Sequence, residues 1–337
     1  MTIELEPAPI DELPADHATD WPNRTIGQTP AWLAFVAESQ GARPVVARVL
    51  DAGRSVGWFT GATVRRGPIR QLGSPLPGWT TAAMGLLVPP DVDRVAAIAA
   101  VPDLARSLGC PHVELADREL ETDVEVPGFR RSWLPGYQLA IGGRADEDLL
   151  AAMTTSGRRD VRRALRNGIE VDAVDPQEPD AFLAEHRHQL EAAFAKRGLR
   201  PTYGASRTAS LVRHLGPTGH LLLLRATTPE GQVAATGIFV GLPGGTVELW
   251  AAASERALQP LLPNEALMWA ALRWWRDAGA ATFDFGGGGS YKRKYGGAEH
   301  RLARLRWSRW SSLEAGRRAA LAVRRSVRRP HPPTPRN

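Results

Sequence analysis

Three apolar segments in the second half of the chain are joined by turns too short to contain a helix. The segments run 220–226, 233–241 and 246–253, separated by Pro229-Glu230-Gly231 and by Pro243-Gly244-Gly245. This spacing is typical of β-hairpins, in which neighbouring strands pair antiparallel. The second half must therefore contain a sheet with at least three antiparallel strands.

Helical and strand-like segments on both sides of these hairpins complete a recognisable order. A short strand is predicted at 169–174, followed by helices at 180–196 and 206–215, where apolar residues recur at helical spacing. After the hairpins come a strongly apolar helix at 264–278 and a strand at 282–285 that leads into four glycines. The order is strand, helix, helix, three antiparallel strands, helix, strand.

The first half of the chain repeats this order more faintly. Thr29 and Pro30 can begin a helix, and segments 45–50 and 55–63 form a hairpin. A helix at 91–108 and a strand at 112–115 follow. Two copies of one plan indicate an internal duplication, and each copy has the size of an ordinary domain.

The predicted fold class is therefore α/β, with an α+β mixed sheet in each of two tandem modules. A length of 337 residues is also more than one core of ordinary size uses. We expect the first module at 1–142, the second module with the reacting centre at 143–310, and a basic tail at 311–337.

Charge is distributed unevenly along the chain. The total is +6, but residues 301–337 contain eleven arginines and one acid, a net of +10, which leaves −4 for residues 1–300. The tail can form a basic amphipathic helix followed by a proline-rich end, so we expect it to contact tRNA or an anionic membrane surface. The single cysteine, Cys110, excludes an internal disulfide framework and a cysteine-rich metal site, and we interpret it as buried. No export signal or apolar membrane span is visible, which predicts a cytoplasmic protein.

The order of elements resembles the GCN5-related N-acetyltransferase (GNAT) fold, and three segments resemble the Fem family within it. The segment 28–33, Gln-Thr-Pro-Ala-Trp-Leu, is similar to the first helix of that family's first domain. Residues 158–164 with Gly168 resemble its basic helix at the start of domain two. Residues 283–287 and 291–297 resemble its stretch of aspartate, paired glycines and aromatic-Lys-x-x-aromatic-Gly.

This resemblance implies an aminoacyl-tRNA-dependent acyltransferase that joins an amino acid or related acyl group to a small-molecule or peptide amine acceptor. No cofactor beyond the activated donor, and no metal, is expected. GNAT members that use coenzyme A carry a glycine-containing loop whose N–H groups bind pyrophosphate at a helix N-terminus. Here residues 258–265 have no glycine and two prolines, which disfavours that donor. An acyl-CoA-dependent N-acyltransferase remains one alternative, and a non-catalytic module that binds RNA or anionic lipid is another.

Two residues are candidates for catalysis. The resemblance places Lys292 at the family's important lysine, where a cation can stabilise the oxyanion that forms during acyl transfer. The other interpretation of Lys292 is a solvated basic loop. Asp284 can accept the proton of the attacking amine or orient Lys292, or it can simply bind loop amides before the glycines. The run Gly286–Gly289 matches no phosphate-binding motif and predicts a flexible access loop or a bulge.

Eight further residues are candidates for substrate binding. The basic helix carries arginines at i and i+4, where like charges repel, so phosphate binding would explain them as well as a solvated face would. Trp79 lies in a glycine- and proline-rich loop that can line a cleft, whereas tryptophans in strands and helices ordinarily belong to the core. The candidates are Trp79, Arg158, Arg159, Arg162, Trp250, Tyr291, Lys294 and Tyr295.

Overall fold

The computed structural model describes residues 3–14, 21, 24–121, 123–196, 198–287 and 289–310, so the predicted basic tail lies outside the described residues. In the first half the strands are β1 (Ile3–Ala8), β2 (Arg43–Asp51), β3 (Arg54–Arg66), β4 (Ile69–Ser74), β5 (Gly85–Leu87), β6 (His112–Asp117) and β7 (Arg130–Ala140). The helices there are α1 (Pro30–Gln40) and α2 (Arg94–Ser107), with 3₁₀ turns η1 (Ile10–Glu12) and η2 (Ile26–Gln28).

The second half begins with two helices. Its helices are α3 (Asp146–Ala152), α4 (Thr155–Arg166), α5 (Asp180–Ala195), α6 (Ala205–Leu215) and α7 (Pro263–Asp277). Its strands are β8 (Glu170–Val174), β9 (Leu221–Thr227), β10 (Val233–Val240), β11 (Thr246–Ser254), β12 (Thr282–Gly287) and β13 (Ala298–Ser308), and its 3₁₀ segments are η3 (Gly216–Thr218), η4 (Arg256–Leu261) and η5 (Ser290–Tyr295). Among the helices in the described part of the chain, none combines the length and apolarity needed to cross a bilayer.

The two halves build the same sheet pattern. In the first, β1, β2, β3 and β4 pair antiparallel in turn, and β4 then pairs parallel with β6. In the second, β8, β9, β10 and β11 pair antiparallel in turn, and β11 pairs parallel with β12. Both the hairpins and the repeat predicted from the sequence are confirmed, and the fold is two tandem GNAT-like modules.

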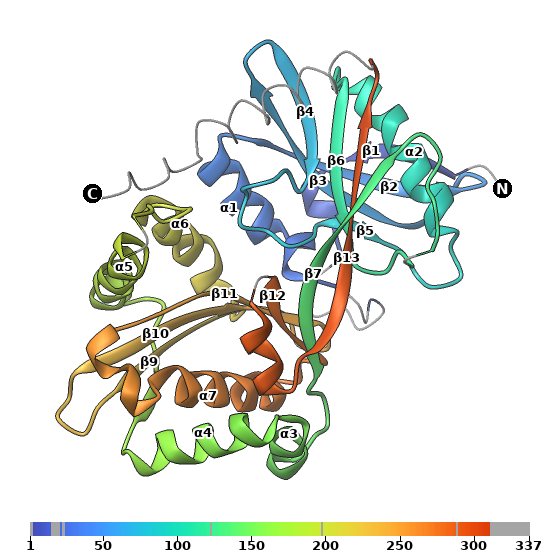
Figure 1. The fold of residues 1–337 in the computed structure, drawn as a ribbon. Helices are drawn as coiled ribbons and strands as arrows, with labels where there is room; N and C mark the ends of the chain where they lie inside the picture. Colours follow the sequence, from blue (N-terminus) through green and yellow to red (C-terminus); the bar gives the residue numbers. More distant parts are fainter. Residues whose placement is uncertain are drawn as a thin grey trace, which may run out of the picture.

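The two sheets are joined by an exchange of strands that the sequence did not reveal. The strand order is β1-β2-β3-β4-β6-β13-β7-β12-β11-β10-β9-β8. Strand β7 follows β6 in the chain but pairs with β12, while β13 follows β12 but pairs with β6. The two exchanged strands also pair with each other over nine residue positions, from Arg130 to Gln138, and run through the centre of the molecule (Figure 1). The predicted boundary at residues 142 and 143 lies between β7 and α3, with strands of one continuous sheet on both sides of it in the chain, and it stays a prediction.

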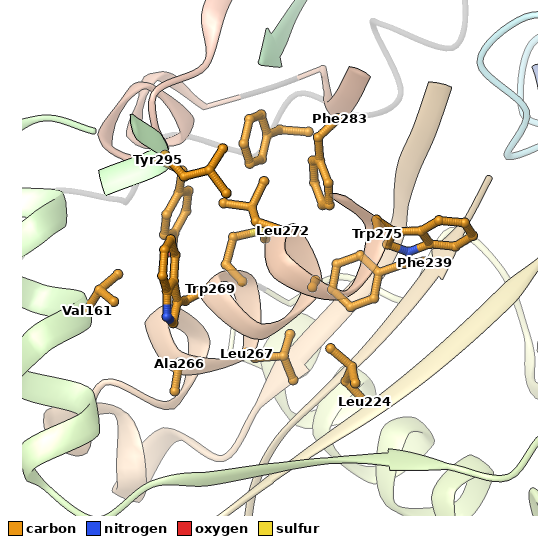
Figure 2. Close-up of a cluster of buried hydrophobic side chains, with 14 of the residues drawn as sticks. Val161, Leu224, Phe239, Ala266, Leu267, Trp269, Leu272, Trp275, Phe283 and Tyr295 are labelled. Atoms are coloured by element: carbon orange, nitrogen blue, oxygen red, sulfur yellow. The ribbon is translucent and has the colours of Figure 1, made fainter. Parts of the chain in front are cut away.

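The core of the second module lies between its sheet and α7. Alternate residues of β9 and β10 face opposite sides of the sheet. One side packs on α7, which α4 covers in turn (Figure 1). Figure 2 shows how side chains from three elements meet around α7 in this core: Phe239 of β10, Phe283 of β12 and Tyr295 of η5.

The opposite side of the β9–β10 pair forms a second core that both modules share. There Leu223 and Ile238 pack with α5 and α6 of the second module and with α1 of the first. Thr29 accepts a hydrogen bond from the backbone N–H of Trp32 (3.3 Å), which caps α1 as the sequence predicts. The two modules are thus joined by a common core as well as by strand pairing.

Helix α4 approaches η5 more closely than a side chain at the contact would allow. The Lys294 carbonyl accepts a hydrogen bond from the N–H of Thr154 (3.2 Å). A Cβ atom on Gly157 would overlap that carbonyl oxygen. Gly157 therefore lets the first turn of α4 rest on η5, the segment that carries Lys292.

Replacing Gly157 with alanine tests this contact, because the sign of the change in the free energy of unfolding depends on it. Helix propensity alone would stabilise α4 by about 1 kcal/mol on this change. We expect instead a loss of about 1–3 kcal/mol in the free energy of unfolding, because backbone at η5 must shift. Urea denaturation measures the difference, with the exposed neighbour Ser156→Ala as the control that should stay within about 0.5 kcal/mol of the native chain. A Gly157→Ala protein more stable than the native one would contradict this account.

Candidate active site

A cavity of about 340 Å³ lies where the two modules meet. Its walls come from the loop 75–82 after β4, from 134–136 in β7, from the end of β12, and from 300–304 in β13. Because β7 and β13 are the exchanged strands, neither module could form this cavity alone. The cavity is at the lower end of the size range typical of small-molecule sites.

The end of β12 is shaped by a β-bulge. Strand β12 pairs with β11 only from Thr282 to Asp284, and against β7 its register shifts between Asp284 and Gly286. Gly286 has a φ of 72°, a conformation that favours glycine, and its N–H donates to Oδ1 of Asp284 (2.6 Å). The predicted bulge in the glycine run is confirmed, and it turns the backbone of Gly286 and Gly287 into the cavity wall.

Two carboxylates from neighbouring strands share one arginine beneath this wall. Arg118 follows β6 of the first module and pairs with Asp284 in β12 and, at 2.6 Å, with Glu248 in β11. The side chain of Arg118 is 10% exposed and that of Asp284 only 5%. Gln138 of β7 also donates to Asp284 (3.3 Å). The four residues tie the first module to the strand ends of the second.

Burial and charge act in opposite directions on these groups. Burial alone would raise the pKa of Asp284, but Arg118, His300 and the N–H of Gly286 together hold it well below its usual range. For Glu248, burial outweighs the attraction of Arg118, so its pKa is raised. Burial alone would lower the pKa of Arg118, and its two carboxylate partners raise it instead. Asp284 is thus the carboxylate of the cluster whose pKa shift favours the ionised form at neutral pH.

Lys292 lies in η5, directly behind the bulge. It is buried, which excludes the solvated loop that was one interpretation of the sequence. Its Nζ donates to the carbonyls of Phe285 and of Gly287, the latter at 2.7 Å. Burial lowers its pKa, while the charge of Asp284 acts the other way. The structure brings Lys292 and Asp284 together around one bulge, and their catalytic roles stay predictions.

The aromatic and basic neighbours of Lys292 point in different directions. Tyr295 is buried and stacks on Phe285 with ring centroids 6.0 Å apart, and burial raises the pKa of its hydroxyl. Lys294 pairs with Glu265 at the start of α7. Tyr291 is 59% exposed. Tyr295 and Lys294 therefore hold η5 against α7, and Tyr291 is the one of the three that is open to a substrate.

The arginines of α4 also divide into two groups. Arg158 donates to the carbonyls of Ala151 (3.2 Å) and Met153 (2.8 Å), so it caps the end of α3. Arg159 is 71% exposed, with a contact to Asp160, and Arg162 is also exposed. The exposed arginines form a basic surface on α4, separate from the cavity wall.

The two tryptophans predicted to bind substrate lie beside the cavity loop. Trp79 is 2% exposed and packs in the shared core, while the residues just before it line the cavity. Trp250 is partly buried, packs against Tyr203 with the ring centroids 4.8 Å apart and donates its Nε1–H to the carbonyl of Thr80 (3.0 Å). Both rings therefore support the 75–82 loop from behind, and contact with a substrate stays a prediction.

Three residues of this site were not among the sequence candidates. Arg118 and Glu248 lie far apart in the chain, and only the strand pairing brings them together. His300 lies in a polar stretch that was not predicted as a strand. The one available signal was the alternation of apolar and polar residues in 303–307, which is typical of a strand with one buried face.

The N-terminus of α7 is the place where GNAT enzymes that use coenzyme A bind its pyrophosphate. Pro263 has no N–H there, and the N–H groups of Glu265 and Ala266 both donate to the carbonyl of Leu262 (3.1 and 3.4 Å). The buried carboxylate of Glu265 also stands in this first turn, paired with Lys294. The N-terminus of α7 therefore has few free N–H groups with which to bind a further anion such as pyrophosphate.

Comparison with protein families gives a match to the second module. Residues 155–295 match the family described as acetyltransferase (GNAT) domain. This segment therefore resembles a GNAT domain in sequence as well as in fold. It extends from α4 to the end of η5 and so contains both Asp284 and Lys292. No sequence among the functionally curated proteins matches the chain.

Solved structures show that the GNAT arrangement extends over nearly the whole chain. The crystal structure of FemX is similar over 86% of this chain and 94% of its own, with 15% identity and a TM-score of 0.69. A tandem GNAT protein from the clavulanic acid biosynthesis pathway covers 91% and 99%, with 14% identity and a TM-score of 0.52. L-PGS from Bacillus licheniformis covers 84% and 92%, with 14% identity and a TM-score of 0.50. The chain shares the two-module fold of these proteins.

The charge cluster beneath the cavity predicts a pH-dependent contribution to stability. Asp284→Asn leaves Arg118 with one carboxylate partner, and we expect the free energy of unfolding at pH 7 to fall by about 3 kcal/mol. A carboxyl whose pKa is depressed in the folded state stabilises the fold above its unfolded pKa of about 3.9 and loses this effect as the pH falls through the folded pKa. The deficit of the variant should therefore shrink below about pH 4.

Urea denaturation between pH 3 and pH 7 measures this difference. Asp123→Asn is the matched control, because the Asp123 side chain is exposed, and it should follow the native chain at every pH. A deficit for Asp284→Asn that is absent, or that stays constant with pH, would show that the ionised carboxylate does not stabilise the cluster.

Proposed function

We propose that this chain transfers an aminoacyl group from aminoacyl-tRNA to an amine acceptor, with the reacting centre at the bulge of β12. The observation that carries the proposal is the N-terminus of α7, where Pro263 has no N–H to donate and the buried carboxylate of Glu265 lies in the first turn. An acyl donor without the pyrophosphate of coenzyme A fits the second module better. The two-module fold shared with FemX supports the same donor class.

The exposed face of α4 supports a donor that carries many phosphates. Arg159, Arg162, Arg163 and Arg166 are all exposed on this helix. Arginines spaced four residues apart repel one another, so their local interactions do not favour this arrangement. Neutralising the phosphates of a nucleic acid would favour it. The predicted basic tail at 311–337 would add to this surface.

The reaction needs little more than position and charge. The acceptor amine attacks the carbonyl carbon of the aminoacyl ester, and negative charge develops on the carbonyl oxygen. Two of the three N–H bonds of Lys292 are directed to the carbonyls of Phe285 and Gly287, which leaves one for this oxygen. The bulge and Lys292 would together hold that charge in a partly buried site, where it is worth more than in water.

The donor test is incubation of the full chain with an amine pool and either a charged-tRNA pool or a set of acyl-CoAs, followed by mass analysis. We expect aminoacylated products with charged tRNA only, and their loss after ribonuclease treatment. Calorimetry should show no saturable binding of coenzyme A, because the α7 N-terminus has few free N–H groups. Tight coenzyme A binding with acylated products would establish the acyl-CoA-dependent alternative instead.

Lys292→Ala should lower turnover by about 100- to 1000-fold, the usual loss when one oxyanion stabiliser is removed. Because Lys292 is buried, the variant should also lose about 1–3 kcal/mol of stability as two carbonyls lose their donor. Turnover is therefore measured well below the midpoint of thermal unfolding. The adjacent, exposed Arg293→Ala is the control and should keep near-native turnover. Equal turnover of the Lys292 and Arg293 variants would remove Lys292 from the mechanism.

A further inference from the structure

The side chain of His300 lies in the space that a side chain at position 136, which is glycine, would otherwise fill. It lies in β13 directly opposite Gly136 in β7, and both residues line the cavity. A Cβ atom on Gly136 would collide with the Nε2 atom of His300. The imidazole ring thus lies over the backbone of the neighbouring strand, which only glycine at position 136 allows.

The position over Gly136 turns one ring nitrogen towards the charge cluster. Nε2 of His300 lies 3.8 Å from Oδ2 of Asp284 and, among the described residues, is buried without a hydrogen-bond partner. A carboxylate on that side favours the tautomer with its proton on Nε2, which leaves Nδ1 to accept another proton. The distance exceeds a hydrogen bond, but catalytic contacts of this kind often shorten only when the substrate is bound.

The charged groups around His300 come from several elements. Asp284 of β12 faces Nε2, with Arg118 and Glu248 beyond it. Lys292 of η5 lies behind the bulge, and Arg304 lines the cavity further along β13, where it contacts Glu114 at 3.7 Å. The ionised group that faces the imidazole is thus Asp284, which is itself paired with Arg118.

The remaining cavity wall is largely apolar. Pro75, Leu76 and Pro77 line one side, and Leu134 and Leu302 line the strands opposite. Such a wall suits methylene groups, whereas the polar groups of Asp284 and His300 are gathered at the β12 end. A ligand with an apolar chain and one positively charged end matches this distribution.

We propose that the cavity binds the acceptor as a primary amine on an apolar chain, and that His300 takes the proton that its ammonium group must lose before attack. The inference rests on the acyl transfer proposed above. The ammonium gives one proton to Nδ1, and the freed nitrogen lone pair forms the C–N bond to the acyl carbon. The C–O bond of the ester breaks, His300 returns its proton to the leaving oxygen, and the second amine proton passes to water.

Steady-state kinetics over a range of pH test the proton transfer. His300→Gln keeps the size of the side chain but cannot accept a proton, so kcat should fall by about 100- to 10,000-fold and the rise of kcat/KM with pH should flatten. His188→Gln, on the exposed face of α5, is the control and should match the native chain. Gly136→Ala should also lower kcat by displacing the ring, and the double variant should be no slower than His300→Gln alone. Native kcat with a native pH profile in His300→Gln would overturn the assignment.

Binding of a simple amine tests the cavity independently of turnover. In imidazole NMR spectra of the full chain, with His300 assigned by the His300→Gln variant, n-butylamine should produce a saturable shift and n-butanol should not. Asp284→Asn should abolish the shift. Equal responses to both probes, or to neither, would overturn the amine site. If n-butylamine binds as expected but no acyl donor supports turnover, the proposed function fails while the amine site stands.

Discussion

The antiparallel pairing of β7 with β13 holds the rest of the structure together. Each strand follows one module in the chain and completes the sheet of the other. Without β13 and β7 beside them, β6 and β12 would be edge strands, and β6 is buried along its whole length. Exposed strand edges of that kind promote aggregation. The exchange removes both edges and places the cavity between the modules.

The cluster of Arg118, Asp284 and Glu248 uses this arrangement to build the site. Its arginine comes from the first module and its carboxylates from two strands of the second. Strands β11 and β12 separate beyond the Glu248–Asp284 pair, and the cluster fixes the point of separation. The bulge that follows is held from the other side by Lys292. Backbone groups at the cavity wall are therefore positioned by charges on both sides of the strand.

Much of the fold could be predicted from the sequence because its signals are local. The hairpins between 220 and 254 depend on turn residues a few positions apart, and the cap at Thr29 on its own helix. Strand β7 gave no such signal, because its partners lie far away in the chain and because it contains arginines and Pro135, and the alternation within β13 did not identify its partners. Without them, neither the cavity nor the exchange could be foreseen.

The residues of the site also differ in whether a local sequence signal could identify them. Lys292 and Asp284 could be proposed because they belong to one short motif, and the bulge because of its glycines. Arg118 and His300 could not, since each matters only through a contact across the strand exchange. Burial of Lys292 was also missed, because three consecutive basic residues predict a solvated segment. Lys292 is buried because η5 packs on α7, through the Lys294–Glu265 pair, and on α4, where Gly157 allows the close approach.

The strand exchange has a consequence for how the chain is made. Strand β6 receives its second neighbour only from residues 298–308, near the end of the described chain. Domains ordinarily fold in order as they leave the ribosome, at about 5–20 residues per second. Here the first module emerges with β6 as an edge strand, and the strand that covers this edge follows tens of seconds later. Two modules that look separable in sequence are thus completed together, because the sheet of the first module gains its last strand only after the second has been made.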